Sequence, residues 1–151
     1  MGKYFSIEEL CKSETAKLYN IDNTPSDEIK EHLEELIKVI DGVREQWTEI
    51  TKKNNWGSPA IYVHSGYRCP KVNTLIKGSK TSEHMLGYAV DFEPVNQHNL
   101  EFYNFTVEYL KSNNIPFSQL INEKPRNGIP SWIHFSINGK KGYRKQIFTL
   151  V

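Results

Sequence analysis

The stretch at residues 82–92, SEHMLGYAVDF, constrains the fold more than any other part of the chain. From Gly87 onward, apolar residues alternate with small or acidic ones, and this period of two is typical of a β-strand with one buried face. The apolar face of the strand would carry Tyr88, Val90 and Phe92. The opposite face would carry Ala89, Asp91 and Glu93. The sequence therefore predicts a carboxylate on a rigid strand, beside a small residue that leaves space around it.

A histidine precedes this strand. His84 lies before a bend that contains Gly87, and glycine permits a tight bend and a close approach of the backbone. Its imidazole could therefore fold back toward Asp91, although seven positions separate the two residues. A histidine and an aspartate at this spacing are by themselves weak evidence for a metal site.

A second strand with the same pattern is predicted at residues 131–137, SWIHFSI, where Ile133, Phe135 and Ile137 form the apolar face. His134 lies on the other face. If both strands turn their apolar faces to one layer of helices, His84, Asp91 and His134 converge on the open face. Two imidazoles and one carboxylate with a free fourth position are typical of catalytic rather than structural zinc. The alternative is that His134 is only a hydrogen-bonded strand residue.

Two longer segments have the period of amphipathic helices. The first is predicted from Pro25, which suits a first helical turn because it has no amide proton to donate, and its apolar residues recur at three- and four-residue steps from Ile29 to Ile50. The second is predicted from Asn96, as its cap, to about Ser112. Its inward residues are expected to be Leu100, Tyr103, Val107 and Leu110.

Shorter elements complete the expected fold. A capping box at Ser6 predicts a short helix toward Leu18, and residues 59–66, 117–122 and 143–150 are predicted to be further strands. Long helices followed by several strands indicate an α+β fold, with helices packed on one face of a small antiparallel sheet that carries the zinc site. The length of 151 residues suits a single domain over residues 1–151.

Composition limits the expected partners and location. Nineteen Lys and Arg against 18 Asp and Glu give a net charge of +1, so no overall field favours nucleic acid or an anionic membrane. The start has no apolar signal core, and no apolar run is long enough to span a bilayer, so we expect synthesis in the cytoplasm unless the sequence is a fragment. Cys11 and Cys69 lack metal-type spacing and are interpreted as free thiols. A monomer is expected.

Three blocks of the sequence together resemble the signature of the zinc D-alanyl-D-alanine carboxypeptidases and related peptidoglycan peptidases. The blocks are Ser65-Gly66-Tyr67-Arg68, Ser82-x-His84-x-x-Gly87-x-Ala89-x-Asp91 and Trp132-x-His134. Their order and spacing are similar to the family's across roughly residues 25–138. The family shares its fold with lysostaphin-type peptidases and the hedgehog signalling domain.

The resemblance implies a role for each matched residue. It implies that His84, Asp91 and His134 are the zinc ligands. It also implies that Arg68 binds and polarises the substrate, for which a guanidinium fork is suited, and that Ser82 braces the ligand loop.

One position departs from the resemblance. Relatives carry an acidic general base three residues before the last histidine, where this chain has Ser131. A serine cannot accept a proton from water at neutral pH, so another residue must serve or the activity is weak. Glu123 is the leading substitute, because a branch of the family resembles the pattern from Gln119 to Glu123, and Glu93 is the reserve. Ser82, Gln119 and Trp132 are further expected substrate contacts, and His64 is interpreted as structural or close to the substrate.

The function implied by the resemblance is that of a zinc metallopeptidase acting on bacterial peptidoglycan. It would hydrolyse peptide bonds in stem peptides or cross-bridges, as a D-Ala-D-Ala carboxypeptidase or as an endopeptidase, with loops 77–81 and 123–130 shaping specificity. A compact catalytic domain without a signal or wall-binding module is typical of phage or prophage endolysins that reach the cell wall by holin-type release.

Two other functions stay open. Ser131 suggests a catalytically inactive zinc-containing domain that binds the cell wall or has a structural role. A hedgehog-like protein-binding domain that uses zinc for stability is the second alternative. The intact Ser65-Gly66-Tyr67-Arg68 block argues against it.

Overall fold

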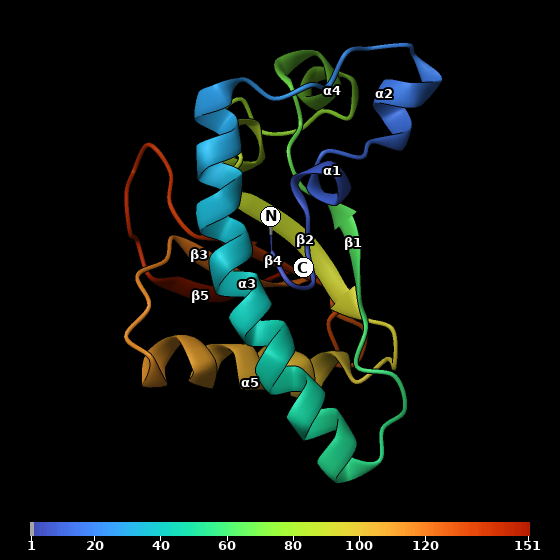
Figure 1. The fold of residues 1–151 in the computed structure, drawn as a ribbon, viewed down its shortest axis with the longest axis vertical. Helices are drawn as coiled ribbons and strands as arrows, with labels where there is room; N and C mark the ends of the chain where they lie inside the picture. The colour runs from blue at the N-terminus through green and yellow to red at the C-terminus, as the bar shows by residue number, and fades with distance from the viewer. Residues whose placement is uncertain (1) are drawn as a thin grey trace.

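Helices cover one face of a five-stranded sheet in the computed structural model, which describes residues 2–151 (Figure 1). The helices are α1 (Ile7–Leu10), α2 (Glu14–Leu18), α3 (Asp27–Asn54), α4 (Pro70–Leu75), the 3₁₀ helix η1 (Glu83–Leu86) and α5 (Asn99–Ser112). The strands are β1 (Ile61–Ser65), β2 (Ala89–Pro94), β3 (Gln119–Glu123), β4 (Trp132–Ser136) and β5 (Gln146–Leu150). The predicted α+β class, with helices on one face of the sheet, is confirmed.

The strand order is β1-β2-β4-β3-β5, and the pairs β1·β2, β2·β4 and β3·β4 are antiparallel. The predicted sheet was wholly antiparallel, but the observed sheet is mixed. The exception is β5, which pairs parallel with β3, with Gln146 opposite Gln119. Since β2 and β3 already flank β4, the chain that leaves β4 must pass the start of β3 to reach a free edge. It therefore enters β5 in the same direction as β3.

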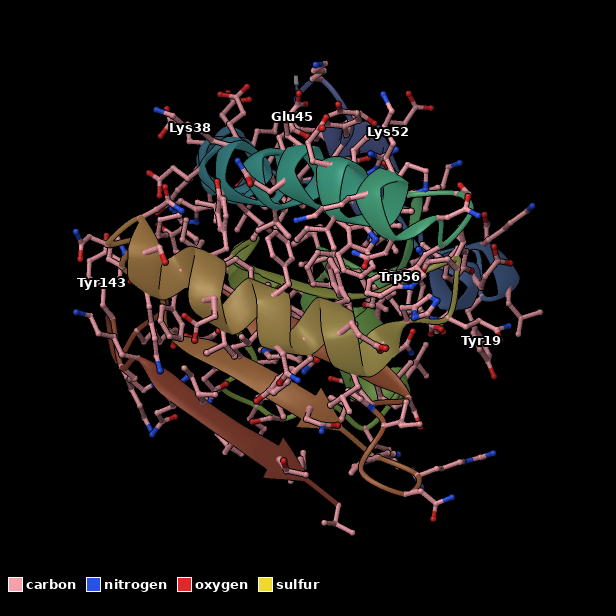
Figure 2. All side chains as sticks on the ribbon, turned by 90° about the horizontal axis from the view of Figure 1, so that it is seen from below. Tyr19, Lys38, Glu45, Lys52, Trp56 and Tyr143 are labelled. Atoms are coloured by element: carbon pink, nitrogen blue, oxygen red, sulfur yellow. The ribbon has the colours of Figure 1, made fainter. Side chains whose placement is uncertain are left out.

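The long helix α3 supplies most of the core from one stripe of its surface. Its buried apolar residues are Leu33, Leu36, Ile37, Ile40, Val43 and Trp47. Each large apolar side chain buried in this way contributes about 1.5–3 kcal/mol. Figure 2 shows Lys38, Glu45 and Lys52 of the same helix pointing away from the sheet. The helix begins at Asp27 because Ser26 is its cap and accepts from the Ile29 amide, so the predicted start at Pro25 is wrong by two residues.

The inward face of α5 differs from the prediction. Its buried residues are Asn99, Phe102, Thr106 and Leu110, whereas the predicted Leu100 is 37% exposed. The ring of Phe102 lies 5.1 Å from that of Trp47 and 5.4 Å from that of Phe92, and these aromatic contacts set the rotation of the helix. Thr106 is accommodated in the core because its hydroxyl donates to the Phe102 carbonyl at 2.8 Å.

The start of α5 also differs from the prediction. The cap residue is His98, two positions after the predicted cap Asn96. The Asn96 side chain accepts from the His98 amide at 3.1 Å, so it shapes the turn before the helix instead of capping it.

The N-terminal segment forms two short helices instead of the predicted single one. Ser6 caps α1 and Ser13 caps α2, each accepting from the amide three residues later, so the second serine starts a new helix. The first helix holds the turn after β1 in place. The carbonyl of its buried last residue, Leu10, accepts a hydrogen bond from the Tyr67 amide at 2.7 Å. A Cβ at Gly66 would lie 2.2 Å from that same carbonyl oxygen, so only glycine fits there. None of the described helices is long and apolar enough to cross a membrane.

Candidate metal centre

His84 is presented by a tight turn that leads directly into β2. Ser82 caps η1 and accepts from the His84 amide at 3.2 Å, and Gly87 ends it with a left-handed backbone at φ 76°. A Cβ on Gly87 would also approach the Ile29 carbonyl oxygen to 3.0 Å, so the turn packs closely on α3. The imidazole of His84 is 3% exposed and faces the open side of the sheet. The bend expected from Gly87 is therefore present.

The three predicted metal ligands converge on the open face. Asp91 on β2 and His134 on β4 are direct partners in the sheet, and His134 Nδ1 lies 2.9 Å from Asp91 Oδ1. His84 Nε2 lies 3.2 Å from Asp91 Oδ2. One donor atom from each of the three residues lies within 4.8 Å of the other two, so the group could hold a metal ion.

The surroundings of His84 prepare its Nε2 atom as a ligand. Nδ1 lies 2.8 Å from the Gly66 carbonyl oxygen, and since a carbonyl only accepts, Nδ1 carries the proton. Burial lowers the pKa of His84, which favours the neutral imidazole that metals bind. The lone pair of Nε2 then faces a carboxylate oxygen of Asp91. A metal ion between the unprotonated Nε2 and this carboxylate would bind both acceptors.

Asp91 is charged at neutral pH. Burial by itself raises the pKa of this carboxyl, but the neighbouring His84 and the hydrogen bond from His134 outweigh burial and hold the pKa well below its usual range. The site thus offers two imidazole nitrogens and one ionised carboxylate. This donor set fits catalytic zinc, which keeps a further position open.

A cavity of about 640 Å³ lies over the three residues. The other predicted site residues all line it: Arg68, Ser82, Gln119, Glu123 and Trp132. Ser79 and Thr81 line it too, so loop 77–81 borders the site as predicted. Of the second loop expected to shape specificity, residues 123–130, only Glu123 is among the described residues that line the cavity.

Arg68 links two walls of the cavity. Its guanidinium donates to Ser82 Oγ at 3.1 Å, which joins the turn after β1 to the loop that carries His84. Burial lowers the pKa of Arg68, whereas the nearby Asp91 carboxylate raises it. The guanidinium lines the same cavity as the three metal-ligand candidates. Ser82 Oγ accepts hydrogen bonds from the Arg68 guanidinium and from the His84 amide, so it links these two residues.

Glu123, the predicted proton acceptor, lines the same cavity as the three metal-ligand candidates. It lies on β3 opposite Trp132 of β4 and Leu150 of β5, and these three residues line the cavity. Burial raises the pKa of Glu123, Asp91 adds a smaller effect in the same direction, and His134 opposes both. A carboxylate whose pKa is raised toward the working pH is a better proton acceptor.

The two competing positions for a general base lie elsewhere. Ser131 does not line the cavity, and its hydroxyl donates to the Lys124 carbonyl at 2.6 Å. Glu93 does not line it either, because its carboxylate contacts His64 Nε2 at 2.5 Å. The geometry therefore favours Glu123 over Glu93.

The comparison with protein families agrees with this geometry. Residues 3–118 match the family model Peptidase M15. The chain belongs to the peptidase M15 family. Members of this family are zinc-dependent hydrolases that act on peptidoglycan. A comparison with curated protein sequences found no match.

The M15 match covers only part of the site. It includes Arg68, His84 and Asp91 but ends before Glu123 and His134. The structure supplies the remaining part, since the pairing of β2 with β4 brings His134 to Asp91. The M15 match therefore supports one half of the centre, and the sheet register supports the other half.

Sequence reasoning missed one wall of this M15 cavity. Residues 138–145, which we name the basic loop, precede β5, and the strand predicted at residues 143–150 begins only at Gln146. Lys140, Lys141 and Arg144 of this loop line the cavity, as does the buried Glu83. Three cations within five positions were the available signal. These cations did not reveal that Arg144 pairs with Glu83, because Glu83 lies far away in the sequence.

Proposed function

We propose that this M15 peptidase holds zinc through His84, Asp91 and His134 and hydrolyses peptide bonds in peptidoglycan stem peptides or cross-bridges, as a carboxypeptidase or an endopeptidase. The observation that carries the proposal is the convergence of these three donors at the base of a cavity in a chain of this family. The open side of the centre faces the cavity, so a peptide can approach it.

The chain's own residues divide the remaining work. Zinc held at this centre supplies Lewis acidity, which polarises the scissile carbonyl and activates water. Glu123 accepts a proton from the attacking water and returns it to the leaving amine. Arg68 donates N–H groups to a substrate carbonyl or to a terminal carboxylate. Trp132, beside Glu123, provides an apolar surface that excludes water around the reacting groups.

The test is digestion of purified peptidoglycan, with mass spectrometry of the released fragments. The wild-type protein should release defined peptide fragments, and Glu123→Gln should release none while keeping its zinc. The masses of the fragments identify the bond that is cut, and thereby distinguish carboxypeptidase from endopeptidase activity.

A second candidate function rests on Ser131, which stands where relatives carry an acid. A catalytically inactive domain that contains zinc and binds the cell wall would keep one zinc and bind peptidoglycan, yet cut no bond. The digestion separates this candidate from the peptidase.

The biological setting is a further part of the proposal. We place the chain among phage or prophage endolysins that act on the cell wall after holin-type release. Family membership supports an enzyme of the cell wall but leaves this setting to experiment. Bacteria that express the chain should lyse when a holin is produced with it. Lysis without the holin would contradict this placement.

A further inference from the structure

The basic loop, residues 138–145, is fixed to the floor of the cavity by a buried carboxylate. Glu83 is 7% exposed, and its Oε1 accepts from the Arg144 guanidinium at 2.8 Å. Arg144 also donates through Nε to Ser118 Oγ at 3.0 Å. The hydroxyls of Ser118 and Ser136 donate to Glu83 as well, at 2.9 Å and 2.8 Å. The network joins the loop to the residue next to His84 and to the end of the strand that carries His134.

The loop is also fixed at its other end. A Cβ on Gly139 would lie 1.8 Å from Glu83 Oε2, so the backbone there packs directly on the carboxylate. One buried side chain therefore holds the loop at Gly139 and at Arg144. Lys140 and Lys141 lie between these two anchors and line the cavity. Their position beside the metal centre is thus set by the fold, unlike that of lysines on a free surface loop.

The charges of the cavity leave these two lysines without a partner among the residues that the structure describes. Of the three carboxylates that line it, Glu83 is paired with Arg144, Asp91 faces the two histidines, and Glu123 is paired with no cation. Neither lysine forms an ion pair or a side-chain hydrogen bond within residues 2–151. The basic loop therefore presents two ammonium groups to whatever enters the cavity.

We propose that Lys140 and Lys141 bind a carboxylate of the peptide substrate and make the enzyme select acidic peptides. The proposal rests on the peptidase function and names its substrate class. A carboxylate is the anionic group that a peptide offers, and ammonium groups bind it as point charges without fixed geometry. The carboxylate belongs either to the C-terminus of the peptide or to an acidic residue inside it.

The test measures binding of synthetic stem peptides to the zinc-loaded Glu123→Gln protein, in which hydrolysis is removed. Three peptides are compared: one with all carboxylates free, one with the C-terminal carboxylate amidated, and one with the internal carboxylate amidated. The pair Lys140→Gln and Lys141→Gln should weaken binding of the free peptide about fivefold, which is what two exposed ion pairs supply. One of the two amidated peptides should bind the parent protein about fivefold more weakly than the free peptide does. The same peptide should bind the lysine variant as well as it binds the parent protein. That peptide identifies the carboxylate that is bound.

Two controls separate a specific contact from a change of net charge. Lys52→Gln with Lys53→Gln, at the exposed end of α3, removes the same charge far from the cavity and should leave binding unchanged. Lys140→Arg with Lys141→Arg should keep most of the preference. Equal binding of the free peptide by the parent and the Lys140/Lys141→Gln protein would overturn the inference, as would an equal loss in the Lys52/Lys53→Gln protein. Failure of the wild-type zinc protein to cut peptidoglycan would instead overturn the peptidase function, because the binding measurement does not depend on cleavage.

Discussion

The two walls of the metal cavity are held in different ways. The ligand wall, which carries Gly66, His84 and Asp91, is fixed by backbone contacts: the Tyr67 amide donates to the Leu10 carbonyl, the Arg68 amide donates to the His84 carbonyl, and Gly66 leaves no room for a side chain. The wall made by the basic loop is fixed by side chains, through the ion pair of Glu83 with Arg144. Backbone contacts between buried segments tolerate little change, whereas a side-chain anchor can be altered without moving the sheet. We therefore expect the first wall to determine metal binding and the second to determine substrate choice.

The largest effect should come from Glu123, which belongs to neither wall. Glu123→Gln removes the proton acceptor but keeps the size of the side chain, so kcat should fall about 10²- to 10⁴-fold. Zinc content should stay at the wild-type value, as measured by elemental analysis. A variant that retains more than a tenth of the wild-type rate would show that another group accepts the proton.

The next effect tests the rigidity of the ligand wall. Gly66→Ala places a Cβ 2.2 Å from the Leu10 carbonyl oxygen, so the backbone must shift and the free energy of unfolding should fall by about 1–3 kcal/mol. Because the Gly66 carbonyl orients His84, zinc affinity should fall with it. Denaturant unfolding and zinc titration check both. Unchanged zinc affinity would mean that His84 is oriented by other contacts.

A loss of stability of similar size, but without loss of zinc, is expected when the anchor of the second wall is removed. Glu83→Gln keeps acceptors for Ser118 and Ser136 but loses the ion pair with Arg144, which is 22% exposed and can be solvated. Stability should fall by about 1–3 kcal/mol, and the preference for carboxylate-bearing peptides should weaken while zinc is retained. Loss of zinc from this variant would place Glu83 in the ligand wall.

The matched counterpart of Gly66→Ala is Gly139→Ala. The new Cβ would lie 1.8 Å from Glu83 Oε2, a side-chain atom, and the loop can move away from it. Peptide selectivity should therefore change, whereas zinc affinity should stay within about twofold of wild type, in contrast to Gly66→Ala. If both glycine variants lose zinc equally, the two walls are not distinct.

The smallest effect concerns pH. Burial lowers the pKa of His84, so protons compete with zinc for this residue only below the ordinary imidazole value of about 6.5. The contribution of His84 to zinc affinity should be constant from about pH 8 down to that value and should weaken as the pH falls further. Zinc titrations across this range check the trend. A decline that begins well above pH 6.5 and disappears in His84→Ala would contradict the lowered pKa.

The ligand wall was predictable from sequence because local patterns determine it. The alternation around Asp91 and His134 predicts two strands with a shared buried face, and Gly87 predicts the bend that returns His84. On α5, Leu110 was correctly predicted to be buried, but the other three inward positions were predicted one residue too late, because Asn99 and Thr106 are polar and yet buried. A pattern of apolar residues cannot include such positions unless the contacts that satisfy them are known.

The second wall was not predictable, because its anchor joins distant residues. Glu83 and Arg144 lie 61 positions apart, and the direction of β5 that brings them together depends on which sheet edge is free. Neither fact is encoded in local spacing. The four cations of the basic loop were visible in the sequence, but the relation of three of them to the cavity was not.

The central claim is that His84, Asp91 and His134 form a catalytic zinc centre. Elemental analysis of the purified protein and of His134→Ala, each combined with peptidoglycan digestion, tests it most directly. We predict about one zinc per wild-type chain together with released peptide fragments. We predict a loss of zinc affinity greater than about 100-fold and no cleavage for His134→Ala, since even outer contacts of a metal site are worth 10- to 100-fold. A wild-type protein that binds no zinc, or that cuts peptidoglycan equally well without His134, would contradict the account.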